Sequence, residues 1–103
     1  MMTFENLDWK GRPVDPSNYD AWVKAYPNVP DLGMYARAIF QNGWGIEVSR
    51  GSQTIGGMEG LFEIRVIGTD GQFCDTSIVA AGPVGHLTKE QVTDYMSQIQ
   101  SLQ

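Results

Sequence analysis

The sequence predicts an α+β fold: a four-stranded antiparallel meander, built from two hairpins, with one face covered by an N-terminal and a C-terminal amphipathic helix. Four segments suit strands and are joined in pairs by turn signals, two others repeat apolar residues at helical spacing, and 103 residues suit one domain. A sheet with one apolar face must be covered, and the helices provide that cover. We expect a single domain over residues 1–103, with an extension at 1–33 and the sheet and last helix at 34–103.

The extension is expected to hold one helix near residues 16–25. Asp15 is a preferred N-cap, and Pro16 suits the first helical position, where an N–H would have no helical partner. Pro27 ends the helix. An aromatic stripe follows helical spacing through Tyr19, Trp22, Val23 and Tyr26. We interpret this stripe as core packing, with a peptide-binding face as the alternative, and expect residues 1–14 to be irregular.

The first hairpin joins residues 34–40 to residues 44–49. The apolar spacing of 34–40 suits a helix as well as a strand, but the Asn-Gly turn signal that follows favours a strand. A three-residue loop at 41–43 places apolar residues opposite apolar ones and a cation opposite an anion. The predicted pairs are Ala36–Val48, Arg37–Glu47, Ala38–Ile46 and Phe40–Trp44.

The second hairpin joins residues 61–67 to residues 73–78 through a loop at 69–71. Alternation of apolar and charged residues along 61–67 indicates one buried and one solvated face. A slip of one residue would move every side chain to the other face, so the agreement of the pairs carries weight. These pairs are Phe62–Ile78, Ile64–Thr76, Arg65–Asp75, Val66–Cys74 and Ile67–Phe73.

The last helix is expected over residues 89–102. Thr88 and Gln91 have the spacing of a capping box, in which each side chain accepts a hydrogen bond from the other residue's main chain. Its apolar face consists of Val92, Tyr95, Met96, Ile99 and Leu102. Residues 51–60 are interpreted as a connector between the hairpins, and residues 79–86 as a crossover of small residues.

Charge and hydropathy restrict the class of partner. The chain has a formal net charge of -5, and residues 51–103 hold six acids and two bases, which gives -4. A general nucleic-acid binder needs a basic surface, and binding to anionic membranes needs one too, so neither partner is expected. No apolar run approaches the length of a membrane span, and the first residues do not resemble a signal peptide. We therefore expect a cytoplasmic protein.

Candidate catalytic groups are few. Cys74 and His86 are the sole cysteine and histidine, and with Asp75 they suggest a cysteine–histidine enzyme. The predicted register directs Cys74 into the core beside Val66, where a thiol behaves as a small apolar group. One cysteine and one histidine do not complete a structural zinc site. We expect no catalytic residue, no metal and no cofactor.

Residues 51–60 have the first glycine spacing of a phosphate-binding loop. Gly57 and Met58, however, stand where that motif has lysine followed by serine or threonine. The alternative to a plain connector is a site for a nucleotide-like small ligand, held by polar side chains and main-chain amides. Its expected residues are Gln53, Thr54, Gly56 and Gly57, with Ser52 beside them.

A string of glycines and apolar residues runs through residues 37–102. Its segments are Asn42-Gly43-Trp44-Gly45, Gly56-Gly57, Gly60-Leu61-Phe62-Glu63-Ile64, Asp75-Thr76 and Val84-Gly85-His86-Leu87-Thr88. This pattern resembles a group of small phage and prophage proteins of unknown function. The chain differs where that group often has tyrosine, at Ile55 and Cys74. The resemblance implies a phage setting and the host cytoplasm, and no catalytic residue.

The leading functional hypothesis is a small acidic interaction module that binds and inhibits a bacterial host or defence protein. Small size, no assembled catalytic set and the acidic C-terminal half favour it. The alternatives are the small-ligand binder and, third, the cysteine–histidine enzyme. A homodimer is also considered, formed by strand edges at residues 44–50 or 72–78. Four acids are expected to form the contact surface: Glu59, Asp70, Glu90 and Asp94.

Overall fold

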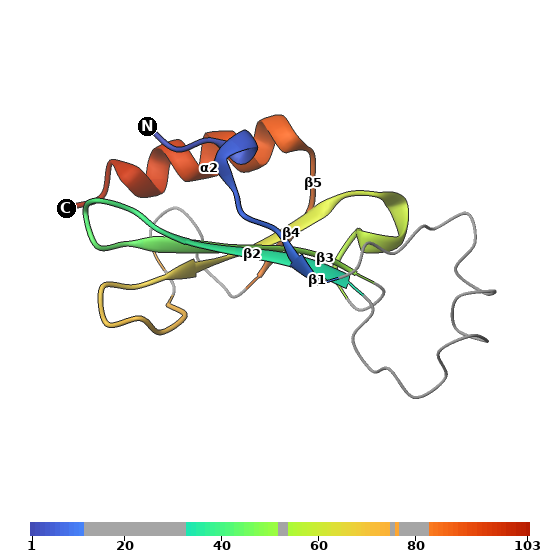
Figure 1. Ribbon diagram of the computed structural model, residues 1–103, viewed down its shortest axis with the longest axis horizontal. Coiled ribbons are helices and arrows are strands. Elements are labelled where there is room, and N and C mark those ends of the chain that lie inside the picture. The colour runs from blue at the N-terminus through green and yellow to red at the C-terminus, as the bar shows by residue number, and fades with distance from the viewer. Residues whose placement is uncertain (12–32, 52–53, 75, 77–82) are drawn as a thin grey trace.

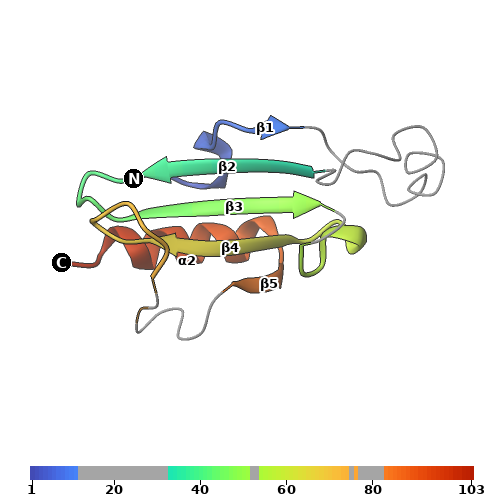
Figure 2. The same ribbon diagram turned by 90° about the horizontal axis from the view of Figure 1, so that it is seen from below.

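A computed structural model describes residues 1–11, 33–51, 54–74, 76 and 83–103. The elements, in chain order, are η1 (Phe4–Asn6), β1 (Lys10–Gly11), β2 (Gly33–Ile39), β3 (Gly45–Gly51), η3 (Gly57–Glu59), β4 (Phe62–Ile67), β5 (Val84–Leu87) and α2 (Lys89–Gln100). The strands form one antiparallel sheet in the order β1-β2-β3-β4-β5 (Figure 2). η1 and α2 lie on the same face of it (Figure 1). The protein is therefore α+β, with five strands and a C-terminal helix; four strands under two helices are not confirmed.

The hairpin between β2 and β3 has the predicted register. The Phe40 N–H donates to the Trp44 carbonyl over 2.7 Å, and Gly43 has a φ of 88°. A glycine adopts this left-handed conformation without steric cost, which allows the three-residue loop to close. The strand interpretation of residues 34–40 is thus confirmed, together with the pairs Ala36–Val48, Arg37–Glu47 and Ala38–Ile46.

The prediction of a hairpin after β4 is confirmed for the turn and the first pairs, but the predicted pairs farther from the turn are wrong. Phe73 forms a bridge with Ile67, and the Cys74 N–H donates to the Val66 carbonyl over 3.1 Å. Farther along β4 the neighbour is β5, a strand that the sequence did not predict. Two observed pairs, Ile64–Val84 and Phe62–Leu87, replace the predicted Ile64–Thr76 and Phe62–Ile78.

The helix that follows β5 explains why β5 pairs with β4 in place of residues 76–78. Thr88 alone separates β5 from α2, so packing of α2 on the sheet holds the preceding residues beside β4. Leu87 is buried in the core and secures the end of β5. Residues 84–86, predicted as part of a crossover, are therefore strand residues. β3 lies between β2 and β4, so the dimer edge predicted at residues 44–50 is wrong, because both sides of that strand are already paired.

The described N-terminal cover is η1 with the residues that follow it. Phe4 packs its ring against Phe62 with centroids 4.9 Å apart, and Trp9 lies 5.7 Å from the same ring. The Gln100 side-chain amide donates to the Met2 carbonyl over 2.8 Å and accepts from the Met2 N–H over 2.9 Å. These contacts attach the N-terminal segment to α2. The helix predicted near residues 16–25, with its aromatic stripe, lies outside the described residues.

α2 begins as the sequence predicted and ends two residues earlier. The Thr88 hydroxyl accepts from the Gln91 N–H over 3.2 Å, and the Gln91 side chain accepts from the Thr88 N–H over 2.9 Å. At the other end, the Asn42 side-chain amide donates to the carbonyls of Ile99 and Leu102, each over 3.0 Å. The turn of the first hairpin thus caps the helix with a side chain from outside it.

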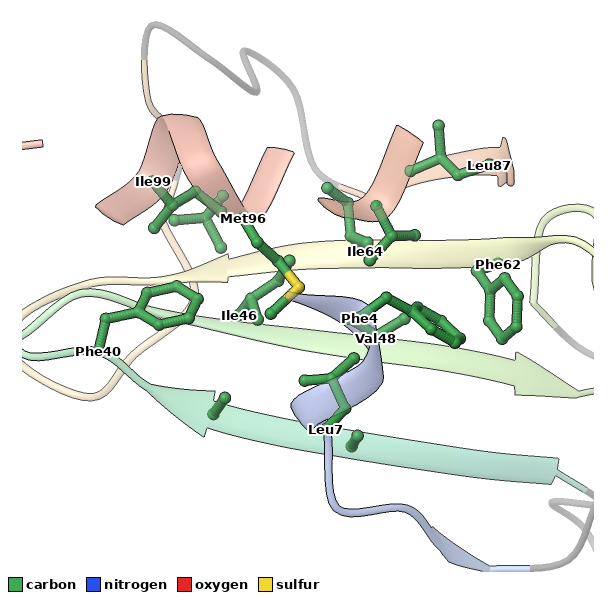
Figure 3. Close-up of a cluster of buried hydrophobic side chains, with 14 residues drawn as sticks. Phe4, Leu7, Phe40, Ile46, Val48, Phe62, Ile64, Leu87, Met96 and Ile99 are labelled. Atoms are coloured by element: carbon green, nitrogen blue, oxygen red, sulfur yellow. The ribbon is translucent and has the colours of Figure 1, made fainter. Parts of the chain in front are cut away.

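The core lies between α2 and the central strands (Figure 3). Met96 and Ile99 of α2 pack on this layer, and both are fully buried. Burial of each such side chain contributes about 1.5–3 kcal/mol. The large side chains of the sheet that are fully buried in this core are Ile46, Val48, Ile64 and Val66. No helix among the described residues is both long and apolar enough to cross a membrane.

Candidate interaction surface

Exposed aromatic, aliphatic and arginine side chains occur together on the sheet face opposite α2, which we call the open face. Because Ala36 and Ala38 point into the core, the alternate residues of β2 point the other way. Tyr35 is 47% exposed and Ile39 is 58% exposed. The remaining described members of the open face are Arg37, Glu47, Ser49, Glu63, Arg65, Ile67 and Phe73.

The ring of Phe73 lies near both arginines of this face. The Arg65 guanidinium carbon lies 4.6 Å from the centroid of its ring, and that of Arg37 lies 5.4 Å from it. Ile67, its bridge partner, is fully buried, whereas Phe73 itself remains 43% exposed. A ring between two guanidinium groups is held by cation–π attraction, worth about 0.5–1 kcal/mol at an exposed site.

Gly45 allows the apolar side chains of this face to approach one another. A Cβ at position 45 would lie 2.7 Å from the Ile39 Cδ1 atom and 3.3 Å from the Ile67 Cβ atom. The missing side chain therefore lets Ile39 and Ile67 converge over β3. The result is a second apolar cluster, composed of Ile39, Ile67 and Phe73, on the side of the sheet away from the main core.

The two arginines differ in their charge partners. Arg37 donates from Nη2 to the Glu47 carboxylate over 2.8 Å and from Nε over 3.2 Å. In the described part of the chain, no carboxylate lies within ion-pair distance of Arg65. Its guanidinium presents several donors in one plane, a geometry that matches a carboxylate. Arg65 faces Glu47 in the sheet register, and Asp75, its predicted partner, lies outside the described residues.

The four acids predicted as a contact surface are exposed but do not form one cluster. Glu59 lies in η3, before β4, while Asp70 lies in the turn after β4, where its carboxylate accepts from the Gln72 N–H over 3.0 Å. Six strand residues separate these two positions, which corresponds to roughly 20 Å. Glu90 and Asp94 lie four residues apart on α2 and share a side of the helix.

The main-chain amides of the glycine-rich loop are used within the chain. The N–H groups of Gly57, Glu59, Gly60 and Leu61 all donate to carbonyls of residues 54–57. The Thr54 hydroxyl accepts from the Gly51 N–H over 2.8 Å and donates to its carbonyl over 3.0 Å. These donors are not directed at a ligand, so the geometry does not favour the nucleotide-like site. Gln53 lies outside the described residues.

Gly56 and Gly57 serve close packing in this loop. A Cβ at Gly57 would overlap the Gly51 carbonyl oxygen, and one at Gly56 would lie 3.0 Å from His86. His86 has a φ of 56°, and its N–H donates to the Ile55 carbonyl over 3.1 Å. Its Nδ1 atom lies 3.3 Å from the Glu59 carboxylate. The loop is therefore secured to β5.

Cys74 and His86 are not brought together. The main chain of Cys74 is bonded to Val66, near one end of β4, whereas Leu87, next to His86, pairs with Phe62 at the other end. Four residues along a strand correspond to about 13 Å, far beyond the hydrogen-bond distance of a nucleophile and its base. No group of three His, Cys, Asp or Glu side chains that could hold a metal ion occurs within the described residues.

Comparison with known proteins adds no assignment. No protein-family model, curated protein or solved structure matches the chain. The function must therefore be argued from the geometry of its own residues. Sequence reasoning missed Tyr35 and Ile39 as surface residues, although the alternation of β2 contains the signal, because both lie opposite the inward-facing alanines.

Proposed function

We propose that this protein is a small interaction module that binds another protein through its open face and so modulates the activity of that partner. The observation that supports the proposal is the exposed cluster of Ile39 and Phe73 between Arg37 and Arg65, with Tyr35 beside it. Arginine and aromatic side chains are enriched at the centres of protein interfaces, where they contribute most of the binding energy. A sheet presents them in fixed positions, which lowers the entropy lost on binding.

The partner is proposed to be a bacterial host or defence protein, and the effect on it inhibition. This part rests on the resemblance of residues 37–102 to small phage and prophage proteins, and it implies action in the bacterial cytoplasm. From the side chains of the open face, we infer that the partner has an apolar side chain near a carboxylate on its contact surface. The apolar group would cover Phe73 and Ile39, and the carboxylate would accept hydrogen bonds from Arg65.

Affinity purification with matched variants tests the proposal. Tagged chain is expressed in bacteria, and captured proteins are quantified for wild type, Phe73→Ala, Arg65→Gln and Asp94→Asn. We expect one dominant partner whose recovery falls at least about tenfold with the first two variants, since hot-spot residues contribute more than about 1.4 kcal/mol. Asp94→Asn is the surface control and should leave recovery unchanged.

Two outcomes would contradict this proposal. Equal recovery of every captured protein by wild type and by Phe73→Ala would mean that the open face is not the contact surface. Loss of the dominant partner with Asp94→Asn or Glu90→Gln, but not with Phe73→Ala, would move the contact to the acidic side of α2 instead. Circular dichroism of each purified variant establishes that a lost interaction does not reflect a lost fold.

A further inference from the structure

The outer edge of β2 is regular over part of its length, and no strand among the described residues pairs with it there. Because the Phe40 N–H donates to the carbonyl of Trp44, the residue before β3, the alternation of an antiparallel ladder directs the main-chain groups of Ala38 and Ala36 to β3 as well. The main-chain groups of Arg37 and Ile39 therefore point away from the sheet. β1 pairs with Met34 and Tyr35, so its cover stops before this stretch. Figure 2 shows β1 beside the start of β2 and not beside its arrowhead.

The opposite edge of the sheet is built differently. β5 pairs with β4 through an irregular register between Phe62 and Ile64, and His86 within it has a φ of 56°. Such irregularities interrupt the row of main-chain groups that another strand would need. β2 has no positive φ from Gly33 to Ile39, and its open stretch includes Ile39, which is 58% exposed. In the described part of the chain, the β2 edge is thus the one suited to accept a strand.

We propose that a second copy of this chain pairs with this edge, β2 against β2 in antiparallel orientation, with Ala38 facing the partner's Ala38. The proposal goes beyond the function proposed above and does not depend on it. In this register Arg37 faces the partner's Ile39, and Ile39 faces the partner's Arg37. Two such pairs exchange about four main-chain hydrogen bonds. The two sheets then form one continuous sheet with a joined open face.

The neighbouring registers are unfavourable on the same geometry. A shift that centres the pairing on Arg37 sets two guanidinium groups opposite each other and needs Tyr35, which β1 already pairs. A shift that centres it on Ile39 needs Gln41, which lies in the hairpin turn. The chosen register is centred on Arg37, Ala38 and Ile39, none of which β1 pairs. β2 contains one arginine and no acid, so this edge also avoids the repulsion that a net charge of -5 per chain would otherwise cause.

Sedimentation equilibrium of the full chain, over a micromolar to millimolar series, gives the first test. We expect the mass to rise from 11.4 kDa toward twice that value as concentration increases. A mass of one chain throughout the series overturns the proposal. Because this measurement uses the purified chain alone, it is independent of whether a bacterial partner is captured by the open face.

A cysteine scan then tests the register. In a Cys74→Ser background, single cysteines are placed at positions 36, 37, 38 and 39, and the chains are mildly oxidised. Ala38→Cys should give the most disulfide-linked dimer, since facing residues of this kind have Cα atoms about 4.5 Å apart, within the range of a disulfide. Ala36→Cys, which faces the partner's Phe40, is the matched control. If the yield of disulfide-linked dimer is highest for the cysteine at position 36, 37 or 39, the proposed pairing is wrong.

Ile39→Pro tests the main-chain contribution. Proline lacks an N–H, and because that of Ile39 points away from β3, no bond within the chain is lost. Two of the four interchain bonds lose their donor, so the dimer dissociation constant should rise at least about tenfold, while Ile39→Val should leave it unchanged. An unchanged constant for a folded Ile39→Pro contradicts the proposal. If that variant does not fold, the cysteine scan still decides.

Discussion

The contact between Asn42 and the C-terminal end of α2 predicts how strongly the first hairpin and the helix depend on each other. Its amide nitrogen donates to the carbonyls of Ile99 and Leu102, and its amide oxygen accepts from the Trp44 N–H over 3.2 Å. Each bond contributes about 0.5–1.5 kcal/mol net. Asn42→Ala removes all three, so we expect the free energy of unfolding to fall by about 2–4 kcal/mol.

Asn42→Asp separates the two parts of this contact. The carboxylate can still accept from the Trp44 N–H, but it cannot donate to the helix carbonyls, and it brings a negative charge to the negative end of the helix dipole. We therefore expect Asn42→Asp to be at least as destabilising as Asn42→Ala. Urea denaturation followed by circular dichroism measures both. Wild-type stability of Asn42→Asp would refute the reasoning, because the turn bond alone would then account for the role of this residue.

Three further predictions concern local backbone geometry. Gly57→Ala should lower the free energy of unfolding by about 2–3 kcal/mol, because the added Cβ overlaps a carbonyl oxygen. Gly60→Ala, which has open space and a φ of 79°, should cost about 1 kcal/mol in the same urea titration, and equal losses would contradict this contrast. His86→Val should be less stable than His86→Asn by about 1 kcal/mol, since β-branched residues tolerate a positive φ poorly; identical melting temperatures would argue against strain there. Thr88→Ala should lower the free energy of unfolding by about 1 kcal/mol. Gln91→Ala should lower it less in the Thr88→Ala background than in the wild type, because the two side chains form one reciprocal cap. Strict additivity of the two would exclude that coupling.

The parts of the fold that the sequence predicted correctly are those whose signals are local. The Asn42-Gly43 turn sets the loop length, and the loop length sets the register of β2 and β3. The capping box formed by Thr88 and Gln91 sets the residue at which α2 begins. In each case a few adjacent residues determine the geometry, so no knowledge of distant contacts is needed.

The parts that it did not predict depend on distant contacts. β5 has neither alternation nor β-propensity at Gly85 and His86, and it lies beside β4 because α2 follows it. The cluster around Phe73 requires Gly45, two strands away, to carry no side chain. Charge and a position outside the predicted strands indicate Glu59 and Asp70 as contact residues, but neither signal reveals that they lie at opposite ends of β4.

The attachment of Met2 to Gln100 has a consequence for the order of folding. Neighbouring strands of this sheet are also consecutive along the chain, and contacts between consecutive elements form faster than contacts between the two ends of a chain. The N-terminal segment, by contrast, cannot dock until residues 98 positions later are in place. Phe4 and Leu7 are therefore synthesised long before the part of α2 to which their segment is bonded. Before α2 is complete, the apolar side of the sheet lacks the cover that α2 and the attached N-terminal segment provide, and exposed apolar surface of this kind favours aggregation.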